Sequence, residues 1–183
     1  SLSRLIRSEG LDVDTFSSAR DFLCFNPPDR PGCILLDLQM PGMTGLELQQ
    51  ALTAGKRSIP IIFITGFGNV PASVQAMKAG AVDFLEKPFA AETLLAAIHR
   101  AIRHDIQSRR TNRELRAVRK RWETLTRREK QVFELVVAGM LNKQIASQLG
   151  ITEKTVKVHR AQIMRKMAAR SLADLVRFSE RLK

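Results

Sequence analysis

Three polar side chains of complementary chemistry each follow a short apolar segment in the first half of the sequence. Asp37 and Thr65 each end such a segment, and Lys87 follows a third. A carboxylate can act as a nucleophile toward a phosphoryl group, while a hydroxyl and an ammonium can bind the oxygens of the group so formed. A single aspartate at the end of a strand is more often a turn or cap residue, so the prediction of phosphoryl chemistry depends on the set of three.

The elements that would position these residues alternate along residues 1–105. Apolar and β-branched runs predict strands over Leu11–Phe16, Cys33–Leu38, Ile59–Thr65 and Ala81–Leu85. Helical patterns lie near residues 18–25, 44–54, 70–79 and 91–104, with start signals at Ser18, Thr44 and Asn69. This alternation predicts an α/β fold with a parallel sheet covered by helices on both faces. Because the carboxyl ends of parallel strands meet at one edge, the three polar residues are expected to converge there.

The positive charge of the chain is confined to its second half. Residues 1–105 contain 10 Lys/Arg and 11 Asp/Glu, whereas residues 106–183 contain the other 20 and 7, giving net charges of −1 and +13. A localised excess of this size predicts a surface for a polyanion, with nucleic acid as the leading partner and a membrane surface as the alternative. No apolar run is long enough to span a membrane. Cys24 and Cys33 lie in apolar stretches and are expected to be small buried residues of a cytoplasmic protein.

Residues 104–122 have a different composition from either side of the chain. The segment is rich in charged and polar residues, lacks Gly and Pro, and has apolar residues at Leu115, Val118 and Trp122. Spacings of three and four predict a helical linker with one narrow apolar stripe. The stripe is consistent either with a solvated helix or with a helix that forms a dimer contact.

The remainder of the chain, residues 123–183, has the pattern of four short helices. Gly150 separates a helix that ends at Leu149 from one that starts after Thr152, which is the pattern of a helix-turn-helix. In the second of these helices an apolar stripe is expected to face the core, while small and basic residues alternate on the opposite side. That mixture suits the major groove of DNA, where Lys and Arg reach guanine or phosphate and small apolar groups approach thymine methyls. The residues on this side are Lys154, Lys157, Val158, Ala161 and Arg165.

The segment LTRREKQVFELVVAGMLNKQIASQLGITEKTVKVHRAQIMRKM closely resembles the LuxR-type helix-turn-helix domain of the FixJ/NarL response regulators. The resemblance implies that Lys157, Val158 and Ala161 occupy base-reading positions. Ala161 departs from the family pattern, in which a longer or basic side chain is frequent, so one base contact is expected to be lost. The resemblance also places Lys143, Lys154 and Thr155 near phosphates.

The last helix, Ser171–Leu182, has two interpretations. By the same resemblance it would carry a dimer contact on DNA through Leu172, Leu175 and Val176. The alternative is that these residues cover the core of the domain.

The segments ILLDLQMPGMTGLEL, IIFITGFG and AMKAGAVDFLEKPF are similar to the receiver domain of the same family. The resemblance implies that a sensor histidine kinase, or a small phosphodonor, phosphorylates Asp37. Thr65 would bind the phosphoryl group, and Phe84 would rotate toward the core. Lys87 would pair with the acyl phosphate. The peptide bond between Lys87 and Pro88 would be cis. Mg²⁺ would be bound by Asp37 and the backbone carbonyl of Gln39. The changes would be relayed to the face formed by residues 70–85 and the following helix, where such receivers dimerise.

The sequence departs from this family at its beginning. Receivers start with a strand that ends in an acidic pair, and Glu9, Asp12 and Asp14 do not occupy those positions. We therefore expect the full gene product to have roughly 15–20 further N-terminal residues. In this chain the Mg²⁺ site is expected to be incomplete, and the predicted strand Leu11–Phe16 is expected to lack a neighbour.

These observations predict a flavodoxin-like receiver lacking its first strand over residues 1–103, a helical linker over 104–122 and a LuxR-type domain over 123–183. The protein is expected to be a DNA-binding transcription regulator and not an enzyme, controlled by phosphorylation of Asp37. Its expected partners are double-stranded DNA, a sensor histidine kinase, a second copy of the chain and RNA polymerase. A membrane is not expected to be a partner.

Two alternatives remain open from the sequence. In the first, the receiver is a protein-binding module without phosphoryl chemistry. In the second, the chain is an aspartate-nucleophile phosphohydrolase. That class would need a second Asp where Gln39 stands, and it leaves the basic region unexplained.

Overall fold

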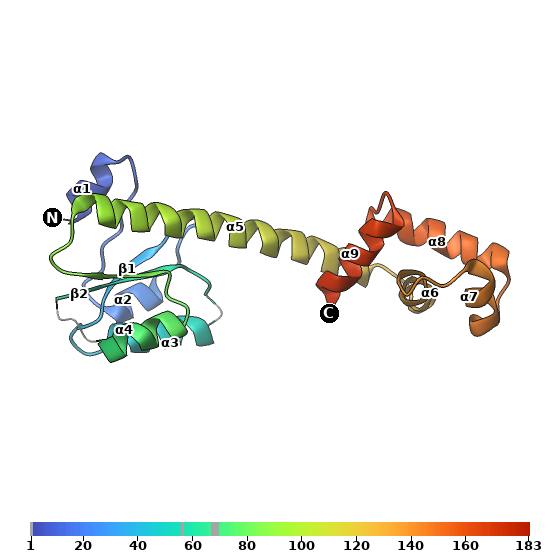
Figure 1. Ribbon diagram of the computed structural model, residues 1–183, viewed down its shortest axis with the longest axis horizontal. Coiled ribbons are helices and arrows are strands. Elements are labelled where there is room, and N and C mark those ends of the chain that lie inside the picture. Colours follow the sequence, from blue (N-terminus) through green and yellow to red (C-terminus); the bar gives the residue numbers. More distant parts are fainter. Residues whose placement is uncertain (1, 56, 67–69) are drawn as a thin grey trace. The chain divides into compact units, whose positions relative to one another are not determined.

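The computed structural model describes residues 2–55, 57–66 and 70–183 (Figure 1). The chain divides into two compact units, Ser1–Arg109 and Arg110–Lys183, each with a core of its own. The predicted helix start at Asn69 lies outside the described residues.

A parallel sheet of three strands lies at the centre of the first unit. Strands β1 (Ile34–Asp37), β2 (Ile61–Thr65) and β3 (Asp83–Glu86) pair in the order β1-β2-β3. All five residues of the central strand β2 are buried, which explains why its sequence is continuously apolar up to the final threonine. The predicted parallel sheet is confirmed, and each of these strands is slightly shorter than its apolar run.

Helices cover both faces of this sheet (Figure 1). Helices α2 (Ala19–Cys24), α3 (Gly45–Ala54) and α4 (Val70–Lys78) pack on one face, where Phe63 and Leu48 are central to the core. Helix α1 (Leu2–Ser8) and the first part of α5 (Ala91–Glu123) pack on the other face around Ile62 and Ile64. Successive residues of β2 thus point into two different hydrophobic clusters, as the alternation of side chains along a strand requires.

The predicted strand over Leu11–Phe16 is wrong. This segment is irregular, because no strand among the described residues lies beside it to accept and donate backbone hydrogen bonds. Side chains hold it instead. Leu11 and Val13 pack beside α1 and α5, and the ring of Phe16 lies 5.2 Å from that of Phe22. Its alternating apolar pattern therefore reflects packing on the domain and not pairing in the sheet.

Helix α5 is continuous over 33 residues and includes the predicted linker. The sequence contains no Gly or Pro between Ala91 and Glu123, so nothing local ends the helix where the composition becomes charged. Near its C-terminus Val118 is buried in the core of the second unit, and the Trp122 ring lies 4.9 Å from that of Phe133. Val118 is therefore a core residue of the second unit, and Trp122 packs against that core.

Four helices complete the second unit: α6 (Arg127–Val137), α7 (Asn142–Leu149), α8 (Glu153–Met167) and α9 (Leu172–Leu182). The side chains of Thr126, Thr152 and Ser171 cap α6, α8 and α9 by accepting hydrogen bonds from backbone N–H groups. The predicted set of four helices is confirmed. Leu175 of α9 is 2% exposed, so at this position the helix covers the core of its own domain.

Candidate functional sites

The carboxyl ends of the three strands bring the predicted acceptor residues to one edge of the sheet. Asp37 is in register with Ile64, the residue before Thr65, and Thr65 is in register with Glu86, the residue before Lys87. The backbone N–H of Lys87 donates to the carbonyl of Thr65 at 2.7 Å. The strand ends therefore place the carboxylate, the hydroxyl and the ammonium on adjacent strands, as the sequence predicts.

Asp37 and Lys87 form an ion pair at this edge. The Nζ atom of Lys87 lies 3.0 Å from Oδ2 of Asp37, and the backbone N–H of Gln39 donates to Oδ1 at 3.0 Å. The two side chains are 44% and 38% exposed for Lys87 and Asp37, so the pair is open to solvent and contributes at most about 1 kcal/mol to stability. Its value is chemical. The ammonium orients a solvent-accessible carboxylate and can neutralise charge on a group attached to it.

Thr65 and Phe84 lie on the neighbouring strands β2 and β3. Thr65 is 2% exposed at the end of the buried strand β2. Phe84 is half-buried in β3, in register with Phe63, and packs against the cluster on the α3 and α4 face. The peptide bond between Lys87 and Pro88 is cis, as predicted.

Gly45, which the sequence analysis did not single out, determines how closely α3 approaches the acceptor residue. Its N–H donates to the carbonyl of Leu38 at 3.1 Å. A Cβ at this position would lie 2.5 Å from the backbone oxygen of Asp37 and 2.9 Å from a ring carbon of Phe63. Only glycine permits this approach. The sequence shows a glycine after Thr44, but the contact is tertiary and could not be found from local pattern.

The second unit contains the predicted helix-turn-helix. Helices α7 and α8 are joined through Gly150, whose φ of 63° is left-handed and whose N–H bonds back to α7. Thr152 then starts α8 by accepting from the N–H of Thr155 at 3.1 Å. Val156, Ile163 and Met167 are completely buried, which confirms the core stripe expected for α8.

The opposite side of α8 is exposed and basic. Lys154, Lys157, Ala161 and Arg165 are exposed, and Val158 is 50% exposed. Thr155 is half-buried, with its hydroxyl 2.9 Å from that of Thr152. Lys143, near the start of α7, is also exposed.

The cations of this surface lack counter-charges. Within the part of the chain that the structure describes, Lys143, Lys154, Lys157 and Arg165 form no ion pair with a carboxylate. In contrast, Lys166 on the other side of α8 lies 2.7 Å from Glu129. The exposed side of α8 and the start of α7 therefore carry positive charge that no carboxylate of the described residues compensates, and a polyanion can neutralise it.

Comparisons with known proteins match both units. The response regulator receiver domain matches residues 1–99, and the luxR family of bacterial regulatory proteins matches residues 123–179. Response regulator protein TodT of Pseudomonas putida is 50% identical over 182 residues, covering 100% of this chain and 80% of TodT. Transcriptional regulatory protein FixJ of Rhizobium meliloti is 46% identical over 179 residues, covering 98% of this chain and 88% of FixJ. The structure of response regulator StyR, 47% identical, aligns with a TM-score of 0.86 over 98% of this chain and 90% of StyR.

The fold and these comparisons define a two-part regulator in which a receiver domain is followed by a helical DNA-binding domain. The chain belongs to the response regulators that carry a LuxR-type helix-turn-helix. It is a transcription regulator and not an enzyme, with DNA and a sensor kinase as partners. The family resemblance and the fold class predicted from the sequence are confirmed. Among the described helices, none is both long and apolar enough to cross a bilayer.

Receiver domains generally bind Mg²⁺ where they are phosphorylated. The donors found here do not amount to a complete site. Both oxygens of Asp37 already accept hydrogen bonds, from Lys87 and Gln39, and Asp12 is paired with Arg30 at 2.5 Å. No group of three or more His, Cys, Asp or Glu residues within the described ranges is arranged to hold a metal ion. One carboxylate and one carbonyl do not fit the six-oxygen shell that Mg²⁺ prefers.

Proposed function

We propose that phosphorylation of Asp37 by a sensor histidine kinase controls DNA binding by the second unit. In this proposal residues 1–103 are the receiver, 104–122 the linker and 123–183 the DNA-binding domain. Asp37 is the phospho-acceptor, Lys87 pairs with the acyl phosphate, and Thr65 binds a phosphoryl oxygen while Phe84 moves. The proposal is supported by the solvent-accessible ion pair of Asp37 and Lys87. It is also supported by the places of Thr65 and Phe84 on the neighbouring strands β2 and β3 of the sheet.

The recognition helix in this proposal is α8, and the observation that carries it is the set of unpaired cations on its exposed side. Lys157, Val158 and Ala161 read bases in the major groove. Lys143, Lys154 and Thr155 contact phosphates, and Arg165 reaches phosphate or guanine. Thr155 is half-buried and its hydroxyl lies beside that of Thr152, so we expect it to reach only a phosphate next to the start of α8.

Selection of bound sequences from a random duplex library tests the interface. The purified chain is expected to enrich one sequence, and the logarithm of its affinity is expected to fall linearly with the logarithm of salt concentration. Lys157→Ala should relax base preference at one position of the selected site, whereas Lys143→Ala should weaken selected and scrambled duplexes equally and reduce the salt slope by about one. Absence of any enriched sequence at physiological ionic strength would contradict the proposal.

Mass spectrometry after treatment with a small phosphodonor tests the acceptor. The expected result is one added phosphoryl group on the peptide containing Asp37, absent from the Asp37→Asn variant. Because the Mg²⁺ donors in this chain are few, the reaction is to be followed with and without added Mg²⁺. A chain that stays unmodified, while still binding its selected DNA site, would favour the alternative in which the receiver is only a protein-binding module.

The remaining partners follow from the same proposal. Two exposed apolar residues of α4, Val74 and Met77, each 46% exposed, support a dimer contact on the receiver. On α9 the dimer contact on DNA is restricted to Leu172 and Val176, because Leu175 is in the core. DNA-bound dimers then meet RNA polymerase. The cytoplasm is the proposed location because the proposed DNA and kinase partners are met there.

A further inference from the structure

A partly buried hydrogen bond joins the two helices of the helix-turn-helix. Nη1 of Arg160, on α8, donates to Oδ1 of Asn142, the first residue of α7, at 3.1 Å. Asn142 immediately precedes Lys143, and Arg160 lies three residues after Lys157, the first base-reading residue proposed above. The bond therefore connects the first turn of α7, which carries Lys143, with a part of α8 one turn beyond Lys157.

The first turn of α7 has weaker local support than the first turns of its neighbours. Leu141 stands at the N-cap position, 69% exposed, and its aliphatic side chain cannot accept a hydrogen bond. From within the helix, the side chain of Gln144 accepts at Oε1 from the N–H of Leu141, at 2.8 Å. The N-cap side chain of α7 thus accepts no hydrogen bond from the first N–H groups of the helix, so a contact with another part of the domain adds support to this turn.

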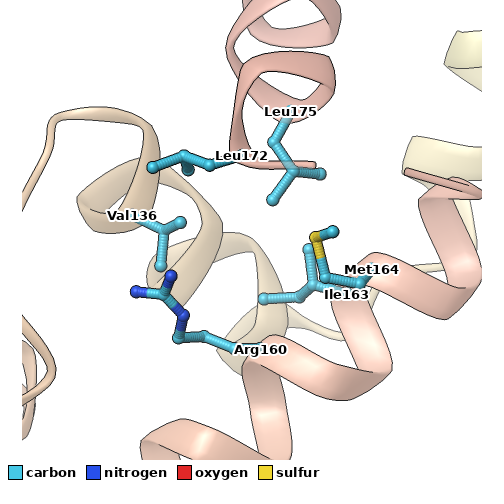
Figure 2. A pocket seen from close by; sticks show the side chains of 6 residues that line it. All are labelled: Val136, Arg160, Ile163, Met164, Leu172 and Leu175. Carbon is cyan, nitrogen blue, oxygen red and sulfur yellow. The ribbon is translucent and has the colours of Figure 1, made fainter. Parts of the chain in front are cut away.

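The side chain of Arg160 is half-buried. It lies beside a pocket of about 140 Å³ whose other walls are apolar, and Figure 2 shows it pointing toward Val136 of α6. The remaining walls come from α8 and α9: Ile163, Met164, Leu172 and Leu175. Among the described residues no carboxylate pairs with Arg160. Apolar walls shield one side of the group from water, so its bond to Asn142 meets less competition from solvent.

We propose that Arg160 is a positioning residue for DNA binding, which acts through Asn142. By fixing the first turn of α7 it holds the ammonium of Lys143 at a set distance from Lys157 on α8. The distance between Lys143 and Lys157 must be constant if one is to contact a phosphate while the other contacts a base. Phosphate contacts set the register in which the bases are read. The inference rests on the DNA interface proposed above, and it adds two residues that the sequence analysis did not identify.

Binding measurements on three variants of the full chain test this role. Arg160→Met keeps an unbranched apolar stem beside the pocket but removes the donors, and Asn142→Ala removes the acceptor. The probes are the duplex recovered by selection and a scrambled duplex of equal length, each titrated by fluorescence anisotropy between about 50 and 200 mM salt. Each single variant is expected to bind the selected duplex about tenfold more weakly. The double variant is expected to be no weaker than either single variant, because both remove one interaction.

The salt slope separates positioning from direct contact. If Arg160 only positions, the slope stays within error of the parent chain, whereas loss of a direct phosphate contact would lower it by about one. Arg177→Met is the matched control. Arg177 on α9 pairs with Asp174 and is 69% exposed, so its substitution removes the same charge without touching α7 or α8. Its affinity is expected to change less than about twofold.

A slope lower by one in Arg160→Met, or losses that add in the double variant, would overturn the proposal. The fluorescence of Trp122, the single tryptophan of the chain, verifies that each variant is folded. If Arg160→Met does not fold, Asn142→Ala alone still tests the proposal, because it must weaken binding with the slope unchanged. If the chain prefers no duplex over another, the proposed interface fails. The role of Arg160 is then decided on the scrambled duplex, by whether the affinity losses of the two single variants add in the double variant.

Discussion

Nζ of Lys166, in the last turn of α8, lies 2.7 Å from Oε2 of Glu129 in the first turn of α6. Glu129 is 1% exposed, and the same oxygen accepts from the N–H of Thr126 at 2.7 Å. Lys166 also approaches the carbonyl of Thr124, just beyond α5, at 3.4 Å. One carboxylate thus completes the cap of α6 and fixes the end of α8, so removing its charge should affect the whole second unit.

We expect Glu129→Gln to lower the free energy of unfolding of the second unit by about 2 kcal/mol, because the buried pair loses its charge-assisted hydrogen bond and Lys166 loses its counter-charge. Trp122 reports this unit alone, since it is the single tryptophan and contacts Phe133 of α6. Urea unfolding followed by its fluorescence measures the change. Glu134→Gln, at an exposed position of the same helix, should cost less than about 0.5 kcal/mol. Equal effects of the two substitutions would show that the pair contributes nothing specific.

The same carboxylate predicts a pH dependence. Burial alone would raise the pKa of Glu129, but hydrogen bonds from Lys166 and Thr126 outweigh burial and lower the pKa below its ordinary value of 4.5. A carboxyl whose pKa is lower in the folded state stabilises the fold above its unfolded pKa, and this contribution is lost as pH falls through the folded value. The difference in stability between the parent chain and Glu129→Gln should therefore be constant near neutral pH and shrink below pH 4.5. A difference that grows with acidity would contradict this assignment.

Val118 is expected to behave as a core residue of the second unit although it belongs to the charged linker segment. It is 3% exposed and packs in the same cluster as Phe133. Val118→Ala should destabilise that unit by about 2 kcal/mol through lost burial and the cavity left behind. Ile106, 49% exposed on the same helix, provides the control, and Ile106→Ala should leave Trp122 unfolding unchanged. If Val118→Ala unfolds like the parent chain, the linker is not part of this core.

Much of the fold could be predicted because local pattern and tertiary structure agree. Strand β2 is buried throughout and apolar at every position before the final Thr65, and the caps at Thr126 and Ser171 are visible as polar residues three positions before Glu129 and Asp174. The polar residues at the ends of the strands likewise indicate the acceptor edge, because parallel strands end together at one side of their sheet.

The predictions failed where structure depends on partners distant in sequence. Leu11–Phe16 has the alternation of a strand, but a strand also needs a neighbour to pair with, and the expected lack of a neighbour outweighs the local pattern. The helix near residues 91–104 and the helical linker were predicted as separate segments, but they form one helix because a change from apolar to charged residues does not stop a helix. The Arg160–Asn142 bond spans 18 residues, and neither residue type is unusual at a helix surface.

Substitution of Gly45 tests how closely α3 must approach the end of β1 at Asp37. Alanine is favoured over glycine inside helices, so helix propensity alone would make Gly45→Ala stabilising. The close approach to Asp37 and Phe63 reverses this expectation, because the backbone oxygen 2.5 Å from the added Cβ cannot move without shifting the end of β1. We expect a loss of about 1–3 kcal/mol in the first unit, measured as faster amide exchange over residues 34–38. Gly32→Ala, where a Cβ meets nothing within 4 Å, should not change that exchange.

The two cysteines should differ sharply in reactivity, which corrects the expectation that both are buried. Cys24 is exposed at the end of α2, whereas Cys33 is half-buried before β1. Burial, together with the nearby charge of Asp105, raises the pKa of the Cys33 thiol to about 11. Since the thiolate is the reactive form, iodoacetamide near pH 8 should alkylate Cys24 within minutes and leave Cys33 largely unmodified until the first unit unfolds. Peptide mass spectrometry with and without urea measures both sites, and equal rates for the two in the folded chain would contradict the packing described for β1 and α5.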